Sequence, residues 1–236
     1  MSIRIKEQWE RVRRAGPAPW TPCKVRGCGE ATNRINRLCY RHRSARREQG
    51  HEQQRAIGLA RIRFYADKVA EFITEVDINA MNAAVERVKR QEDDFVATHT
   101  DPQHRSTNAS GQPYTRRERV EYAARKELSE TLGNLRDVQI ATKLVVGMTV
   151  IQEIEPSLIV SDDAFLHQIA RAVRRAHRPP KGGKHSPVPT RAGVMVEAGR
   201  RIYEAVGTVA LRLAREARLR DEREHMERMK HGYVQA

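Results

Sequence analysis

The sequence predicts an all-α fold. Glycine and proline, 14 and 10 of 236 residues, are few and gather mostly in a handful of loops, while Ala, Arg, Glu, Leu and Val fill the long runs between them. Within these runs, apolar residues recur at intervals of three and four, the period of one helical face. Because only 39% of the residues are hydrophobic and 5% aromatic, the core is modest, and we expect an elongated helical scaffold.

All three cysteines of the chain lie near one histidine in a short segment. The spacing is Cys-x4-Cys-x10-Cys-x2-His, formed by Cys23, Cys28, Cys39 and His42. Two short-range pairs separated by a loop are typical of a tetrahedral Zn²⁺ site. The surrounding segment has too few apolar residues to fold by burial alone, so we expect the metal to supply most of its folding free energy.

Other uses of these cysteines are less favoured. A disulfide framework would leave one cysteine odd, and residues 1–14 lack the apolar stretch of a signal peptide. Cys3His sites are usually closed, whereas catalytic zinc keeps a position open for water, so a structural zinc is the better interpretation. His51 is an alternative fourth ligand, although His42 completes the second short pair.

Positive charge is concentrated at the N-terminal end. Residues 1–63 hold 16 Lys and Arg against five acids, a net charge of +11 of the whole chain's +14. Arginine dominates there, and its planar fork binds phosphate in a bidentate manner. This predicts contact with nucleic acid, against the alternative of a solvated basic face. The candidate contact residues, for nucleic acid or another partner, are Arg26, Arg34, Arg37, Arg41, Arg43, Arg46 and Arg47.

The first half of the chain is expected to form a module and a hairpin. We assign residues 1–46 to a basic N-terminal helix, within 3–14, followed by the zinc module. No proline interrupts the chain for about 60 residues after Cys39, which places His42 near the start of a long helix. Residues 47–99 are predicted to form an antiparallel helical hairpin whose second helix is capped by Asp77.

The second half begins after a polar segment, 100–114, which we interpret as a linker between domains. Residues 115–232 are then a helical domain ending in a long helix. Thr115 caps a helix that Gly133 ends. The segment that Asn134 opens, 135–156, favours a helix over a strand despite the β-branched run from Leu144 to Ile151. Another helix starts at 161–163, and a basic loop follows at 179–190, where either a phosphate contact or a solvated linker is expected.

The last helix is expected from about residue 191 to 230. Its heptad-like seam fades after Leu213, leaving a charged second half that is either solvated or a docking surface for a partner helix. Candidate partner-helix residues on this and the earlier apolar stripe are Ile62, Tyr65, Val69, Phe72, Leu219, Met226 and Met229. No apolar stretch reaches 18 residues, so we expect no membrane partner.

No arrangement of residues indicates catalysis. The chain has no Gly-rich phosphate loop, no Gly-x-Ser-x-Gly and no His-Glu-x-x-His. Without a Cys-x-x-Cys it also lacks the metal signature of zinc deaminases. We therefore expect a protein that is not an enzyme.

The cysteine-containing segment resembles a family of small modules. The stretch CKVRGCGEATNRINRLCYRH is similar to the Cys3His modules of actinobacterial phage proteins, with their Cys-x4-Cys beginning and Leu-Cys-x-x-His close. In some of those proteins an HNH nuclease domain follows, and it is absent here. By length, basicity and helical remainder, the chain also resembles the recombination directionality factors of actinophages that use large serine integrases.

That resemblance implies a function without catalysis. The protein would bind a serine integrase, on DNA that it contacts directly or through the integrase, and switch the reaction toward excision. It would act in the host-cell cytoplasm and associate with the nucleoid when bound. The alternative is a zinc-containing DNA-binding regulator or replication accessory protein whose N-terminal arginines contact DNA, with an affinity that falls steeply with salt.

Overall fold

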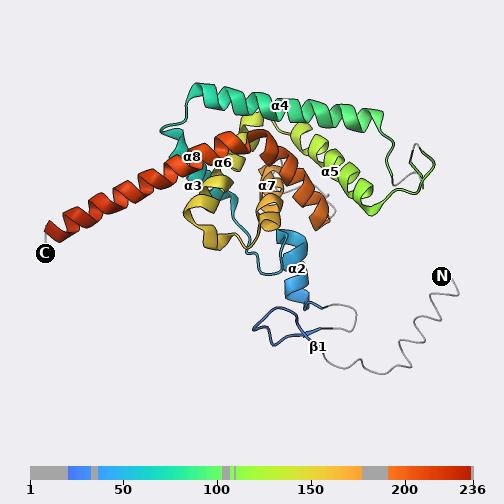
Figure 1. Ribbon diagram of the computed structural model, residues 1–236, viewed down its shortest axis with the longest axis horizontal. Coiled ribbons are helices and arrows are strands. Elements are labelled where there is room, and N and C mark those ends of the chain that lie inside the picture. Colours follow the sequence, from blue (N-terminus) through green and yellow to red (C-terminus); the bar gives the residue numbers. More distant parts are fainter. Residues whose placement is uncertain (1–20, 33–36, 103–106, 109, 177–190, 235–236) are drawn as a thin grey trace, which may run out of the picture.

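The computed structural model describes residues 21–32, 37–102, 107–108, 110–176 and 191–234. The helix expected within 3–14, the arginine at position 34 and the basic loop 179–190 lie outside the described residues. Seven α-helices follow a two-stranded antiparallel sheet in the described part of the chain. The all-α prediction, with a small N-terminal Cys3His module and a long C-terminal helix, is confirmed (Figure 1).

The strands are two residues each and the helices differ widely in length. β1 is Thr21–Pro22 and β2 is Ala31–Thr32. The helices are α2 Tyr40–Gln49, α3 Leu59–Ala70, α4 Glu75–Thr98, α5 Arg116–Gly133, α6 Val138–Ile154, α7 Asp162–Ala176 and α8 Ala192–Val234. A 3₁₀ turn, η1, covers Pro156–Leu158 between α6 and α7.

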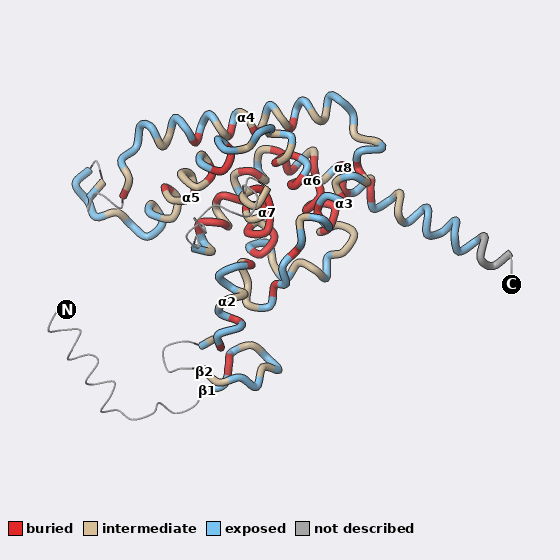
Figure 2. Tube along the Cα trace, turned by 180° about the vertical axis from the view of Figure 1, so that it is seen from behind, coloured by how far each residue is buried: buried red, intermediate tan, exposed pale blue. Residues whose placement is uncertain are grey.

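Helix α6 lies at the centre of the core. Every residue from Leu144 to Ile151 is buried, and α3, α4, α7 and α8 all pack against α6 (Figure 2). A helix buried on all sides needs no polar face, which explains why its β-branched run could also suit a strand. The predicted helix is confirmed, and Asp137 caps it by accepting a hydrogen bond from the Gln139 N–H, 2.8 Å away.

The predicted antiparallel hairpin within 47–99 is wrong. Helix α3 packs on α6, α4 packs on α5, and α3 and α4 barely touch. Helix α4 begins three residues earlier than expected, with Thr74 as its cap and Asp77 as the reciprocal partner of a capping box. Adjacency in sequence suggested the pairing, but the buried stripe of α3 fits the surface of α6 instead.

The long helix expected from His42 is also wrong, because α2 ends at Gly50. This glycine has a φ of 88°, in the left-handed region that closes helices, and its N–H donates to the Arg46 carbonyl. A Cβ at this position would lie 2.6 Å from the His167 Cβ, so the close approach of α7 also requires glycine. The chain then runs as a loop to Gly58, the N-cap of α3.

The polar segment 100–114 does not separate two domains. It joins α4 to α5, which pack on each other, and one core cluster contains residues from both sides of it, including Val85 and Leu128. An ion-pair network adds to the connection: Glu92 on α4, 2% exposed, bonds Arg125 on α5 and Arg201 on α8. The predicted cap at Thr115 is confirmed, since Thr115 and Glu118 form a capping box at the start of α5.

Helix α8 begins in the core and leaves it. Up to residue 230, Ala217 is its last buried residue, and the ion pair from Asp221 to Lys68 of α3 is its last bond to another described helix. Beyond this point the helix extends away from the body as an arm, 222–234 (Figure 1). None of the described helices combines the length and the apolar character that crossing a membrane requires.

Candidate metal centre

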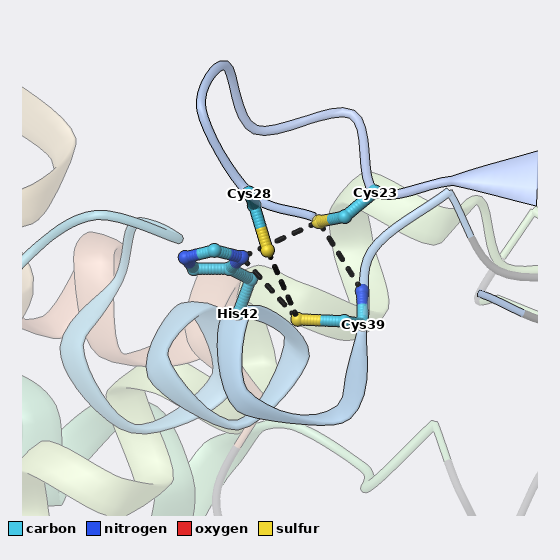
Figure 3. A group of neighbouring side chains, drawn as sticks. All are labelled: Cys23, Cys28, Cys39 and His42. Carbon is cyan, nitrogen blue, oxygen red and sulfur yellow. Dashed lines mark hydrogen bonds between the residues drawn. The ribbon is translucent and has the colours of Figure 1, made fainter. Parts of the chain in front are cut away.

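Four side chains from two short segments converge in the N-terminal module (Figure 3). Cys23 follows β1, and a turn through Gly27, with a φ of 77°, brings Cys28 back toward it. Cys39 is the N-cap of α2 and His42 lies in the first turn of that helix. One helix start and one glycine turn therefore hold the two pairs of donors that the sequence spacing predicted.

The donor atoms are close enough to hold one metal ion. Nδ1 of His42 lies 3.3 Å from both the Cys23 and Cys39 sulfurs, and the Cys28 and Cys39 sulfurs are 4.0 Å apart. All four donor atoms lie within 4.8 Å of one another. Cys23, Cys39 and His42 are buried, so water does not surround the cluster. His51 is not among these donors; its Nδ1 accepts a hydrogen bond from the Gln53 N–H.

The surroundings of the sulfurs favour ionisation at one of them. Burial raises the pKa of Cys23, but the backbone N–H groups of Cys39 and Val25 and the His42 ring outweigh it and lower that pKa to about 6. The Cys39 N–H donates to the Cys23 sulfur over 3.4 Å. At Cys28 a backbone bond at Glu30 lowers the pKa, but burial and the neighbouring sulfurs outweigh it and raise the pKa. Crowded thiolates of this kind are stabilised by a cation between them.

A buried polar junction attaches the module to the helical body, and sequence reasoning missed it. At the end of α2, Gln49 accepts hydrogen bonds from Gln168 and Arg171 of α7, at 3.0 and 2.6 Å. In the loop after α2, the Gln54 side chain donates a hydrogen bond to the Leu158 carbonyl and accepts one from the Val160 N–H. Gln49, Gln54 and Gln168 are all buried. A buried glutamine far from any partner in sequence gives no local signal of its bonds.

The predicted contact arginines that the structure describes are exposed, and most have no acidic partner among the described residues. Arg43 lies over the Tyr40 ring and Arg47 pairs with Glu48. The others that the structure describes form no side-chain ion pair with a described residue; they are Arg26, Arg37, Arg41 and Arg46. By contrast, many arginines of the helical body are neutralised by acids, namely Arg61, Arg125, Arg174, Arg201, Arg212 and Arg218.

The partner-helix candidates divide into two groups. Ile62, Tyr65 and Val69 are buried and Phe72 is half-buried against the core, so the prediction of a docking face on this stripe is wrong. The exposed members are on α8: Leu219 is 49% exposed, Met226 58% and Met229 48%. The regular spacing of the apolar residues on α3 did indicate a packing face, but that face packs against α6 within the chain.

No family model, characterised protein or solved structure matches the chain.

Proposed function

We propose that the four donors hold a structural Zn²⁺ ion. Zinc with bonds of about 2.3 Å to sulfur and 2.0 Å to nitrogen places tetrahedral ligands roughly 3.5 to 3.8 Å apart. The 3.3 and 4.0 Å separations lie on either side of these values. Four protein donors fill every tetrahedral position, leaving none for a reactive water. The metal therefore folds the module, and Cys39→Ser should lower the bound zinc from one ion per chain to well below one.

We propose further that the protein is a DNA-binding accessory factor without catalytic activity, and that its module contacts phosphates. The local excess of basic over acidic residues in the module carries this proposal. Described residues 21–32 and 37–50 contain seven Lys and Arg but only two acids. Clustered like charges on a small folded surface repel one another, and binding of a polyanion relieves this repulsion.

Replacing arginines of α2 tests this proposal. The triple variant Arg43→Ala, Arg46→Ala and Arg47→Ala should weaken binding of labelled duplex DNA, measured by fluorescence anisotropy at several salt concentrations. Each lost phosphate contact should lower the slope of log affinity against log salt by about 0.9. The matched control replaces three exposed body arginines, which are Arg63, Arg87 and Arg90. Equal effects of the two triple variants would contradict phosphate contact by the module.

A second candidate function is that of a recombination directionality factor that docks on a large serine integrase. The C-terminal part of α8 favours it, because Leu219, just before the arm, and Met226, within the arm, are exposed apolar residues that a partner helix can pack against. To reverse an integrase's preference from 1:99 to 99:1, such a factor must bind one arrangement about 10⁴-fold more tightly than the other.

Recombination between purified sites tests the second candidate. Integrase with this protein should convert attachment products back to the parental sites, and Leu219→Glu with Met226→Glu should abolish that conversion while leaving the DNA affinity unchanged. Intact protein that neither binds integrase nor alters its direction would remove this candidate and leave the DNA-binding proposal standing.

A further inference from the structure

We propose that the cleft between the metal module and the loop 52–55 is a phosphodiester-binding site, in which Arg55 acts together with Arg26 and Arg41. This rests on the proposed DNA-binding function and names where one phosphate is held. The cleft has a volume of about 490 Å³. Arg26 reaches it from the turn between the cysteines, Arg41 from α2 and Arg55 from the loop.

The cleft is built from parts that other interactions fix. On one side lie Cys28 and His42, two of the four metal-ligand candidates, so a bound metal would hold that wall in place. On the other side the buried Gln54 holds the loop to the body, because its side chain accepts from the Val160 N–H and donates to the Leu158 carbonyl. Positioned walls lower the entropic cost of ordering a ligand between them.

The charge of the cleft favours an anion. Three arginines line it against one acid, Glu52, and none of the three arginines forms an ion pair with a described residue. Guanidinium groups approaching from three separate segments can surround a tetrahedral phosphate, which a flat basic face cannot do. The volume exceeds that of one phosphate and accommodates the sugar attached to it, so a phosphodiester is a better match than a free ion.

Arg55 is the decisive residue because it belongs to neither the metal site nor α2. Arg55 is exposed, and its side chain forms no hydrogen bond, ion pair or ring contact with a described residue, so removing it should leave the fold and the metal unaltered. The sequence alone offered no reason to separate it from the other arginines of residues 1–63. Only the fold of the loop against the body brings it opposite Arg26 and Arg41.

The test compares Arg55→Ala, Arg55→Lys and the control Arg63→Ala in the full-length protein loaded with zinc. Probes are a fluorescein-labelled 20-mer duplex and the single strand of the same sequence, followed by anisotropy across a range of salt. We expect Arg55→Ala to weaken binding roughly 10-fold on at least one probe and to lower its salt slope by about 0.9. Arg55→Lys should recover the salt slope but only part of the affinity, because lysine lacks the planar fork.

Two other outcomes would contradict the cleft proposal, alone or together with the DNA-binding proposal. If the wild type binds with a steep salt dependence but Arg55→Ala behaves as Arg63→Ala on both probes, the cleft is not the site and the DNA-binding proposal survives. If the wild type, with one zinc per chain, binds neither probe, both proposals fail. Zinc content and thermal midpoint, measured on every variant, confirm that a loss of binding does not come from unfolding.

Discussion

Gly199 lies where the backbones of α7 and α8 approach each other closely, and replacing it with alanine should separate them. A Cβ at this position would lie 1.9 Å from the Leu166 carbonyl oxygen and 2.6 Å from its carbon. Real Cβ contacts essentially never fall below 3.0 Å, so the helices must separate by at least about 1.1 Å locally. Gly193, in the same helix, has nothing nearer than 4.0 Å to its added Cβ and serves as the control.

The expected free energies follow from these distances. Overpacking costs about 1 to 3 kcal/mol, and the upper end applies because the obstructing atoms are backbone and cannot rotate away. Alanine is favoured over glycine within a helix by about 1 kcal/mol, so Gly199→Ala should destabilise the protein by about 2 kcal/mol. Gly193→Ala should stabilise it by about 0.5 kcal/mol, because it gains helix propensity without a clash.

Thermal unfolding of the zinc-loaded protein, followed by circular dichroism, measures the difference. For a chain of this size, 1 kcal/mol shifts the midpoint by about 2 to 4 °C, so Gly199→Ala should lower it by about 4 to 8 °C. Gly193→Ala should raise it slightly. A Gly199→Ala midpoint equal to or above that of the wild type would show that α7 and α8 are not in backbone contact.

Three further predictions concern the metal, the buried histidine and the arm. Chelation should remove hydrogen-exchange protection from the described residues 21–32 and 37–49 while α6 keeps its own, since none of these described residues belongs to the core cluster. Burial and the Arg171 charge lower the pKa of His167 to about 4 from 6.5, so the unfolded chain binds more protons in that interval. The free energy of unfolding should therefore fall by up to about 3 kcal/mol as the pH drops from 6.5 to 4. Urea unfolding at several pH values measures this, and the free energy of unfolding of His167→Gln should fall less over the same pH interval. Leu219→Glu with Met226→Glu should leave the unfolding midpoint within about 1 °C of the wild type, because both residues are exposed.

The local elements could be predicted because their signals are local. Thr115 with Glu118 three residues later specifies a helix start, and the structure forms that capping box. The four metal-ligand candidates lie within 20 residues, so their spacing alone brought them together. Gly50 was a comparable signal that was overlooked: a glycine just after Arg46 and Arg47 is typical of a helix C-terminus.

The pairing of helices could not be obtained in this way. The stripe through Ile62 and Val69 gave the buried face of α3 but not its partner, because an apolar stripe fits any complementary groove of suitable shape. The close contact between α3 and α6 depends on Gly147, where a Cβ would lie 2.2 Å from the Ile62 carbonyl oxygen. A glycine inside a helix carries no indication in sequence of which helix approaches it.

The metal site and the proposed phosphate site differ in how far the sequence reveals them. The metal donors are neighbours along the chain, whereas Arg55 lines the same cleft as Arg26 and Arg41 in a loop that Gln54 holds to Leu158, about a hundred residues away. The cleft therefore needs both a folded module and a folded body. Unfolding of the module, or loss of the Gln54 bonds that hold the loop to the body, should weaken phosphate binding without altering any arginine. DNA affinity therefore reports whether the module is folded and attached to the helices.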